Sequence, residues 1–340
     1  MFQSPEEFTE SNNAISRPGV LGGIIAHLGS TIQLLLTRKV YRVKEELAIA
    51  AKHWSAPKPK IGWWFNDQVI RHINKLVCGE PLEGFASGVH KRMLELSPSG
   101  FMRGISVGCG NGQKEIDLLK KGIVKRFDLY EISLARAEQG AALAIEQGVA
   151  DRLKFHVGDA FAANIPKNSY DLVYWNNSLH HMMDVEQAIG WSHERLINGG
   201  HFVMDDFVGP ARFQWTQPQL DMATWVRKLL PEKYMLAPQG NGALMPTSVG
   251  KPAFEQLLEI DPSEAADSDR ILEALPHHFK NVQVTLTGGC VYFLAMNEIQ
   301  QNFSSIDPID CDLLAYLLSL DETLAKMGQS LYAVAFAVKE

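Results

Sequence analysis

Three glycines at alternate positions, Gly108, Gly110 and Gly112, stand at the start of a stretch whose later residues fit a helix. A glycine-rich turn from a strand into a helix lets the backbone approach a ligand closely and presents free N–H groups, so such turns bind nucleotides. The spacing lacks the third glycine of the dinucleotide fingerprint, because position 113 is Gln, and it lacks the Gly-Lys-Ser/Thr of a P-loop. Alone, the motif could be ordinary turn chemistry, so its meaning depends on the residues around it.

Polar residues follow the next expected strands at positions where a bound nucleotide would need them. Glu131 ends the second strand, where a carboxylate can accept hydrogen bonds from both hydroxyls of a ribose. Asp159 comes after the third strand, and Asn176 to His181 come after the fourth. Open α/β sheets bind ligands at the carboxyl ends of their parallel strands, so we expect these residues to share one edge. Taken alone, Glu131 could be a solvated carboxylate that a helix N-terminus favours.

Such an edge requires a parallel sheet, and the chain from Arg103 to Asp206 has the pattern of one. Short apolar runs alternate there with helical stretches, as in strands joined by crossover helices. Ser133 and Asp184 are expected to cap two of the helices, and the pair Gly199-Gly200 is expected to end the second of them. The five expected strands contain residues 105–107, 127–129, 153–157, 170–175 and 201–204.

Beyond Asp206 the regular alternation lapses for some seventy residues. Helical patterns occupy residues 216–230 and 310–327, and strand-like runs begin at Asn281 and Leu331. We expect an α/β domain over residues 101–340 that carries insertions at about 208–280 and 288–330. Residues 1–100 are expected to form a helical extension or lid, with helical patterns over residues 19–36, 44–54 and 61–76.

The segment from Gly19 to Leu36 is strongly apolar. Its large residues recur at three- and four-residue steps, which describes one apolar stripe on a helix, and polar residues such as His27 and Gln33 interrupt it. We expect this helix to pack against the body of the protein or to make a homodimer contact, with interfacial membrane contact as the alternative. No integral membrane segment and no cleavable signal peptide are expected.

Charge and cysteine usage narrow the class of partner. The 340 residues carry a formal net charge of −7, so the chain lacks the basic surface with which proteins neutralise nucleic-acid phosphates. We therefore expect no nucleic-acid partner. The four cysteines have neither metal-ligand spacing nor a disulfide rhythm, which favours a reducing cytoplasm and predicts no metal site; they are Cys78, Cys109, Cys290 and Cys311.

The combined motifs resemble those of the class I S-adenosylmethionine-dependent methyltransferases, over Arg103 to Phe207. The resemblance implies a Rossmann-like, seven-stranded, mainly parallel sheet with helices on both faces, in which the two late strands form the reversed hairpin that ends the sheet. It also implies the cofactor S-adenosylmethionine, which leaves as S-adenosylhomocysteine. The residues that the resemblance assigns to this cofactor are Gly108, Cys109, Gly110, Asn111, Gly112, Glu131, Ile132, Asp159, Ala160 and Asn176.

One position departs from the family pattern. The family commonly carries Asp or Glu two residues before the first glycine, near the amino group of the methionine part of the cofactor, and this chain has Ser106 there. A hydroxyl can accept a hydrogen bond but adds no charge. Recognition of the ammonium group then falls to another carboxylate or to backbone oxygens.

Methyl transfer from a sulfonium is an in-line displacement, so the protein mainly has to hold donor and acceptor in line. A hydroxyl or acidic-carbon acceptor must also lose a proton, and His180 or His181, beside the expected methyl group, could take it near neutral pH. Asp206, after the fifth strand, is a second catalytic candidate. The alternatives are that the two histidines only shape their loop and that Asp206 is an exposed loop carboxylate.

The acceptor is expected to be a small molecule. The segment after the fourth strand reads NNSL, which differs from the Asn/Asp-Pro-Pro-Tyr of enzymes that methylate the amino groups of adenine and glutamine. An O, N or C acceptor atom remains open, and a specialised metabolite would suit a pocket with apolar walls. Candidate lining residues, for which ordinary packing is the alternative, are Trp63, Trp64, Arg71, His72, Arg212, Phe213 and Trp215.

Two other functions stay open. A non-catalytic protein that retains the fold would bind the cofactor without turnover, or would not bind it at all. A nicotinamide-dependent oxidoreductase would prefer NADH, and the missing third glycine of the dinucleotide pattern argues against it.

Overall fold

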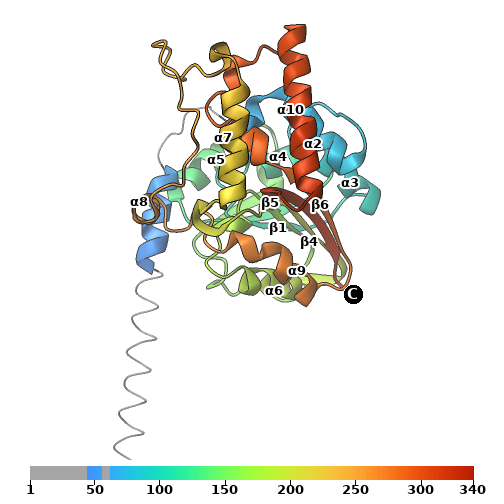
Figure 1. Ribbon diagram of the computed structural model, residues 1–340. Helices are drawn as coiled ribbons and strands as arrows, with labels where there is room; N and C mark the ends of the chain where they lie inside the picture. The colour runs from blue at the N-terminus through green and yellow to red at the C-terminus, as the bar shows by residue number, and fades with distance from the viewer. Residues whose placement is uncertain (1–43, 56–61) are drawn as a thin grey trace, which may run out of the picture. The chain divides into compact units, whose positions relative to one another are not determined.

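The computed structural model describes residues 44–55 and 62–340 (Figure 1). The chain divides into two compact units, Met1–Glu45 and Glu46–Glu340, and the features below belong to the larger one. The apolar segment over residues 19–36 lies outside the described residues. Among the described residues, no helix combines the length and the apolar character that a membrane crossing requires.

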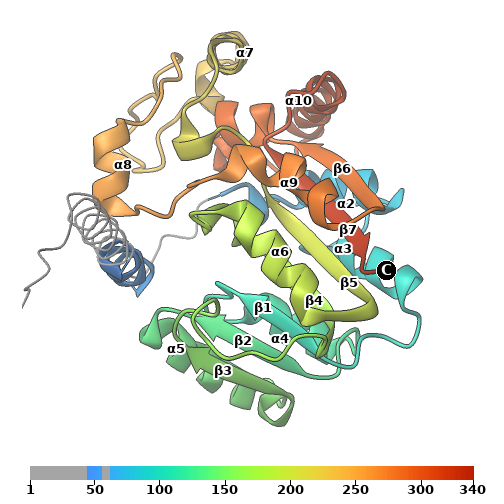
Figure 2. The ribbon, with the colours of Figure 1, turned by 90° about the horizontal axis from the view of Figure 1, so that it is seen from below.

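A seven-stranded sheet forms the centre of the larger unit (Figure 2). The strand order is β3-β2-β1-β4-β5-β7-β6; the first five of these strands in that order are parallel, and β7 runs antiparallel to both of its neighbours. This arrangement confirms the predicted mainly parallel sheet with a reversed hairpin at its end. The strands are β1 (Gly104–Val107), β2 (Phe127–Glu131), β3 (Leu153–Val157), β4 (Tyr170–Asn176), β5 (Leu196–Phe207), β6 (Val282–Gly288) and β7 (Tyr332–Val338).

Helices cover both faces of the sheet, which explains why its central strands are apolar on both sides. Along β4, Leu172 and Tyr174 belong to one hydrophobic cluster, whereas Val173 and Trp175 belong to the other. The first cluster packs against α2 (Asp67–Cys78), α4 (Gln113–Lys120), α7 (Gln217–Leu229) and α10 (Pro308–Lys326), and the second packs against α6 (Val185–Arg195) and α9 (Ile271–His278). The other described α-helices are α3 (Ser87–Leu96), α5 (Leu134–Glu146), α8 (Phe254–Ile260) and a helix over residues 44–55, where the sequence predicted one.

The predicted helix caps are present. The Ser133 hydroxyl accepts the N–H of Arg136 at the start of α5, and Asp184 accepts the N–H of Gln187 at the start of α6. One predicted boundary is wrong, because α6 ends at Arg195 and not at the pair Gly199-Gly200. The buried Leu196 already pairs with Tyr170 of β4, and the residues that follow it form a bulge in β5 before pairing resumes at His201.

Candidate active site

The turn between β1 and α4 needs its glycines. Gly108, Gly110 and Gly112 have φ values of +66°, +60° and +67°, in the left-handed region that other residues rarely adopt. A Cβ added to Gly112 would lie 2.9 Å from the Cδ1 of Leu129, so packing also excludes a side chain there. Within 4 Å of a Cβ added to Gly110, the described residues place no atom. The middle of the turn therefore presents bare backbone to open space.

Glu131, the last residue of β2, holds this turn from the neighbouring strand. Its Oε2 accepts the backbone N–H of Gly110 at 2.8 Å, and its Oε1 accepts that of Ser133 at 2.8 Å. The side chain is buried, which raises the pKa of Glu131, although the backbone donors act in the opposite direction. Each carboxylate oxygen can accept a further hydrogen bond, so Glu131 can hold the turn and still bind a ligand hydroxyl.

The next two strand ends also present polar groups at the same edge. After β3, Asp159 accepts the N–H of Phe161 at 2.8 Å and so fixes that turn. At the end of β4, the buried Asn176 donates from its side chain to the hydroxyl of Tyr174, and its carbonyl accepts from the Nζ of Lys114 at 2.6 Å. The remaining residues that the sequence assigned to the cofactor lie on the turns after β1, β2 and β3; they are Cys109, Asn111, Ile132 and Ala160.

Asp206, on β5, is fully buried and organises the segment that follows β4. Its Oδ2 accepts the N–H groups of Ser178 and Leu179 at 2.9 Å and 2.8 Å, and its Oδ1 lies 2.5 Å from the Nδ1 of His180. Burial alone would raise the pKa of Asp206, but the charge of His180 and the donated hydrogen bonds lower it. The alternative of an exposed loop carboxylate is therefore wrong, because the exposed fraction of this residue is 0%.

The two histidines face different partners. Burial alone would lower the pKa of His180, but Asp206 and Glu264 outweigh that effect and raise it to about 10. His181 places its Nδ1 3.0 Å from the Ser263 hydroxyl, and its ring packs edge-on against Trp54 at 5.1 Å between centroids. Burial and the charge of His180 lower the pKa of His181 to about 4. Near neutral pH, His180 is an imidazolium ion and His181 is a neutral imidazole.

A segment from the long region after β5 completes this cluster. Glu264 places its Oε1 3.5 Å from the Nε2 of His180, and Asp261 receives a hydrogen bond from the Nε1 of Trp54 at 2.7 Å. One ring nitrogen each of His180 and His181 and one carboxylate oxygen of Glu264 lie within 4.8 Å of one another, which is close enough for the three side chains to hold a metal ion. The contacts of these side chains with Asp206, Ser263 and each other also account for the cluster as a network of hydrogen bonds and charges.

Arg212 and Phe213 lie beside this cluster. Both adopt positive φ, 57° and 53°, which is strained for residues with side chains and so must be enforced by their contacts. The guanidinium group of Arg212 donates to the carbonyl oxygens of Pro262 and Glu264, and the ring of Phe213 stacks on Trp215 at 5.1 Å between centroids. Arg212 therefore fixes the backbone that carries Glu264.

The remaining predicted acceptor residues do not share one place. Trp63 is buried in an aromatic cluster with Tyr292 and Tyr332, at centroid distances of 5.2 Å and 5.4 Å, and Tyr332 also contacts Phe207, whose ring lies 6.0 Å from that of His180. Trp64 is 42% exposed.

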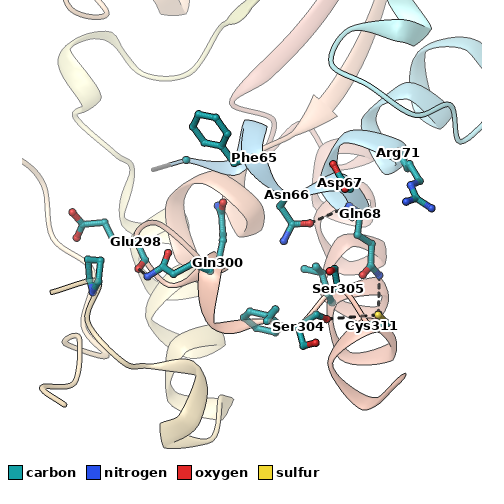
Figure 3. A pocket seen from close by; sticks show the side chains of 15 residues that line it. Phe65, Asn66, Asp67, Gln68, Arg71, Glu298, Gln300, Ser304, Ser305 and Cys311 are labelled. Carbon is teal, nitrogen blue, oxygen red and sulfur yellow. Dashed lines mark hydrogen bonds between the residues drawn. The ribbon is translucent and has the colours of Figure 1, made fainter. Parts of the chain in front are cut away.

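Arg71, on α2, lines a cavity of about 710 Å³ (Figure 3). The lining of that cavity comes from residues 62–71, 298–305 and 311–314 together with Pro238, and includes none of the strand ends. Aromatic contacts therefore connect Trp63 to the histidines, whereas Arg71 faces a separate cavity and His72 follows it on α2.

Comparison with known sequences adds a finding that this geometry cannot supply. Residues 105–204, from β1 into β5, match a family described as methyltransferase domain. Residues 105–204 therefore belong to a methyltransferase domain family. The match covers the glycine turn, Glu131, Asp159 and both histidines of this chain.

Curated relatives share this region. The chain is 30% identical over 126 residues to a polyketide synthase of Burkholderia thailandensis, a match that covers 37% of this chain and 6% of that protein. It is 38% identical over 85 residues to a probable chloroplastic tocopherol O-methyltransferase of rice (Oryza sativa subsp. japonica), covering 25% and 23%. It is 32% identical over 104 residues to the 27-O-demethylrifamycin SV methyltransferase of Amycolatopsis mediterranei, covering 31% and 38%. The matches thus span at most 38% of these relatives.

A solved structure shares the fold of this chain over most of its length. The geranyl diphosphate C-methyltransferase of Streptomyces coelicolor, with a TM-score of 0.50 and 13% identity, matches 87% of this chain and 98% of its own. The likeness in fold therefore extends well beyond residues 105–204.

Several residues of the site were missed by sequence reasoning. Glu264, Asp261 and Ser263 lie in a connection without regular periodicity, and no spacing relates them to the histidines some eighty residues earlier. Lys114 and Glu115 follow the glycine turn directly, but a charged pair at a helix start gives no sign that both side chains turn inward. The signal that could have found Glu115 is the unusual Ser106, which leaves room for a carboxylate from a neighbouring element.

Proposed function

We propose that this protein transfers a methyl group from S-adenosylmethionine to a small-molecule acceptor, and that His181 removes a proton from that acceptor. One observation carries the proposal: the glycine turn, Glu131 and the two histidines with Asp206 belong to parallel strands whose carboxyl ends share one edge of the sheet. Open α/β sheets bind their ligands at that edge.

The residues at this edge fit the cofactor. Gly110 offers backbone with open space in front of it, and the oxygens of Glu131 can accept bonds from ribose hydroxyls. Asp159 lies on the turn after the next strand, where the adenine would contact it. Bound there, S-adenosylmethionine supplies an electrophilic methyl group. The protein's own task is to hold the two reactants in line and to exclude water.

His181 is the better base of the two histidines. It is neutral near pH 7, because its pKa is lowered to about 4, whereas His180 already carries a proton. His180 is held between Asp206 and Glu264, and its charge helps to keep a proton off His181. This division of roles suits a hydroxyl or an acidic carbon as the acceptor group.

The acceptor class follows from the walls of the site. Phe207 packs against both His180 and Phe213, at centroid distances of 6.0 Å and 5.1 Å, so aromatic surface borders the histidines. Curated relatives are named for methylation of tocopherol and of a rifamycin precursor, which are bulky hydroxyl-bearing molecules. We therefore favour O-methylation of a specialised metabolite with substantial apolar surface, with Arg212 and Phe213 near the acceptor.

An assay with methyl-labelled S-adenosylmethionine tests this function. A panel of phenols, enols, aliphatic alcohols and amines is incubated with the wild-type protein and with His181→Ala. Transfer of label to a hydroxyl or enol compound, strongly reduced in the variant, is the expected result. Transfer only to amines would contradict the acceptor class, and binding of cofactor with no transfer to any acceptor would favour the non-catalytic alternative.

A further inference from the structure

A buried carboxylate lies next to the glycine turn, on the helix that the sequence predicted there but at a residue to which it assigned no role. Glu115, the third residue of α4, has an exposed fraction of 1%, as does Ser106 of β1. The Ser106 hydroxyl donates to the Oε1 of Glu115 at 2.7 Å. The side chain of Glu115, from α4, thus brings a carboxylate next to Ser106 of β1, where the strand itself has no acidic residue.

The second oxygen of this carboxylate lacks a partner. Among the described residues, Glu115 Oε2 has no hydrogen-bond partner, although the atom is buried. A buried polar atom without a partner costs free energy, and a carboxylate oxygen costs more than a neutral group. A ligand with a hydrogen-bond donor beside Oε2 would remove this cost, and a positively charged donor would form the strongest hydrogen bond.

Lys114, the residue before Glu115, has another partner. It is half-buried, and its Nζ donates to the carbonyl of Asn176. Burial lowers the pKa of Lys114, while the charges of Glu115, Asp205 and Asp206 act in the opposite direction. Lys114 thus lies among three carboxylates, of which Asp206 is paired with the charged His180. Neither cation is a hydrogen-bond partner of Glu115 Oε2.

The position of Glu115 relative to the turn is also defined. Glu115 lies close to the turn because α4 begins directly after Gly112, and its charge and that of Glu131 both act on the Cys109 thiol, whose pKa is raised mainly by burial. Glu131 is the proposed ribose residue. Glu115 is bonded to Ser106, the position at which the family commonly carries the acidic residue near the ammonium group of the methionine part.

We propose that Glu115, oriented by Ser106, binds the α-ammonium group of the methionine part of the cofactor. The proposal rests on the proposed function. In it, Glu115 takes the place of the acidic residue that the family commonly has at the position of Ser106. Burial raises the pKa of Glu115, and the Ser106 hydroxyl and the charge of Lys114 counter that effect. An ammonium group beside Oε2 would favour the ionised carboxylate further.

The test compares two ligands on several proteins by calorimetric titration. One ligand is S-adenosylhomocysteine, and the other is its analogue in which hydrogen replaces the α-amino group. We expect Glu115→Gln to weaken binding of S-adenosylhomocysteine at least tenfold, about 1.4 kcal/mol. The same variant should leave the affinity for the deaminated analogue within about twofold of the wild-type value, because that ligand makes no ammonium contact. Asp117→Asn, on the same helix but partly exposed, should change neither affinity.

An exchange variant keeps the test decisive if Glu115→Gln folds poorly. In Ser106→Asp combined with Glu115→Ser, the carboxylate and the hydroxyl trade places across the same hydrogen bond. This protein should retain the wild-type preference for S-adenosylhomocysteine over the deaminated analogue. Equal weakening of both ligands in Glu115→Gln, or loss of the preference in the exchange variant, would overturn the assignment. Failure of the wild-type protein to bind S-adenosylhomocysteine would instead overturn the proposed function itself.

Discussion

The imidazole rings of His180 and His181 lie only 4.1 Å apart between their centroids, yet their surroundings shift their pKa values in opposite directions. Asp206 sits 2.5 Å from the Nδ1 of His180 and keeps that ring protonated, and the resulting charge helps to keep a proton off its neighbour. The segment after β4 thereby holds a charged imidazolium, His180, next to a neutral imidazole, His181.

The pH dependence of turnover should reflect His181 as the base. Because burial and the charge of His180 lower its pKa to about 4, we expect the rate to be constant around neutral pH and to fall as the pH drops through about 4. The initial rate at saturating cofactor, measured across the acidic range with circular dichroism to confirm that the protein stays folded, checks this. A midpoint near the ordinary value of 6.5 would show that the neighbouring charge does not act on the base.

Replacing His181 by alanine should lower turnover while cofactor affinity stays nearly intact. A positioned general base typically contributes about 10²-fold or more to the rate, and the His181 ring contacts Ser263 and Trp54, which are not part of the glycine turn. Single-turnover rates and titration with S-adenosylhomocysteine separate the two effects. His277→Ala, at an exposed histidine on α9, is the matched control, and equal losses in both variants would remove His181 from the mechanism.

Replacing Asp206 by asparagine should destabilise the fold, by about 3 kcal/mol near neutral pH, since it leaves the charge of His180 poorly paired in the interior. The pKa of His180 is raised in the folded protein, so its contribution to stability is fully present below 6.5 and is lost as the pH rises through about 10. The difference in unfolding free energy between the two proteins should therefore shrink in strongly alkaline buffer. Urea unfolding at both pH values measures it, with the exposed Asp269→Asn as control. A loss below 1 kcal/mol at neutral pH would contradict the role given to Asp206.

Gly110→Ala should abolish cofactor binding while the protein still folds. The new Cβ meets no described atom within 4 Å, so it would project into the space that the ligand needs, and the backbone strain at φ +60° costs about 1–2 kcal/mol. Gly148→Ala carries the same strain at φ +69° after α5 and equally open surroundings. Comparable affinities of the two variants for S-adenosylhomocysteine would show that Gly110 does not face the cofactor.

Local signals in the sequence were enough to predict the sheet and one side of the site. Ser133 and Asp184 cap their helices through side-chain hydrogen bonds that depend only on neighbouring residues. Three glycines at alternate positions are visible in the sequence, and all three adopt positive φ in the structure. The partners that act on these residues from a distance were not predictable. Glu264 reaches His180 from a connection without periodicity, and Glu115 turns inward because α4 packs over Ser106. Such contacts are set by tertiary packing, which no local pattern records.

The roles proposed for Glu131, Glu115 and His181 all require that S-adenosylmethionine binds at the glycine turn. The measurement that tests this most directly is calorimetric titration with S-adenosylhomocysteine of the wild-type protein and of Glu131→Ala, with NADH as a competing ligand class. We expect one site per chain, strong weakening in the variant because ribose contacts are lost, and no binding of NADH. Absence of binding to the folded wild-type protein, or a preference for NADH, would contradict the account.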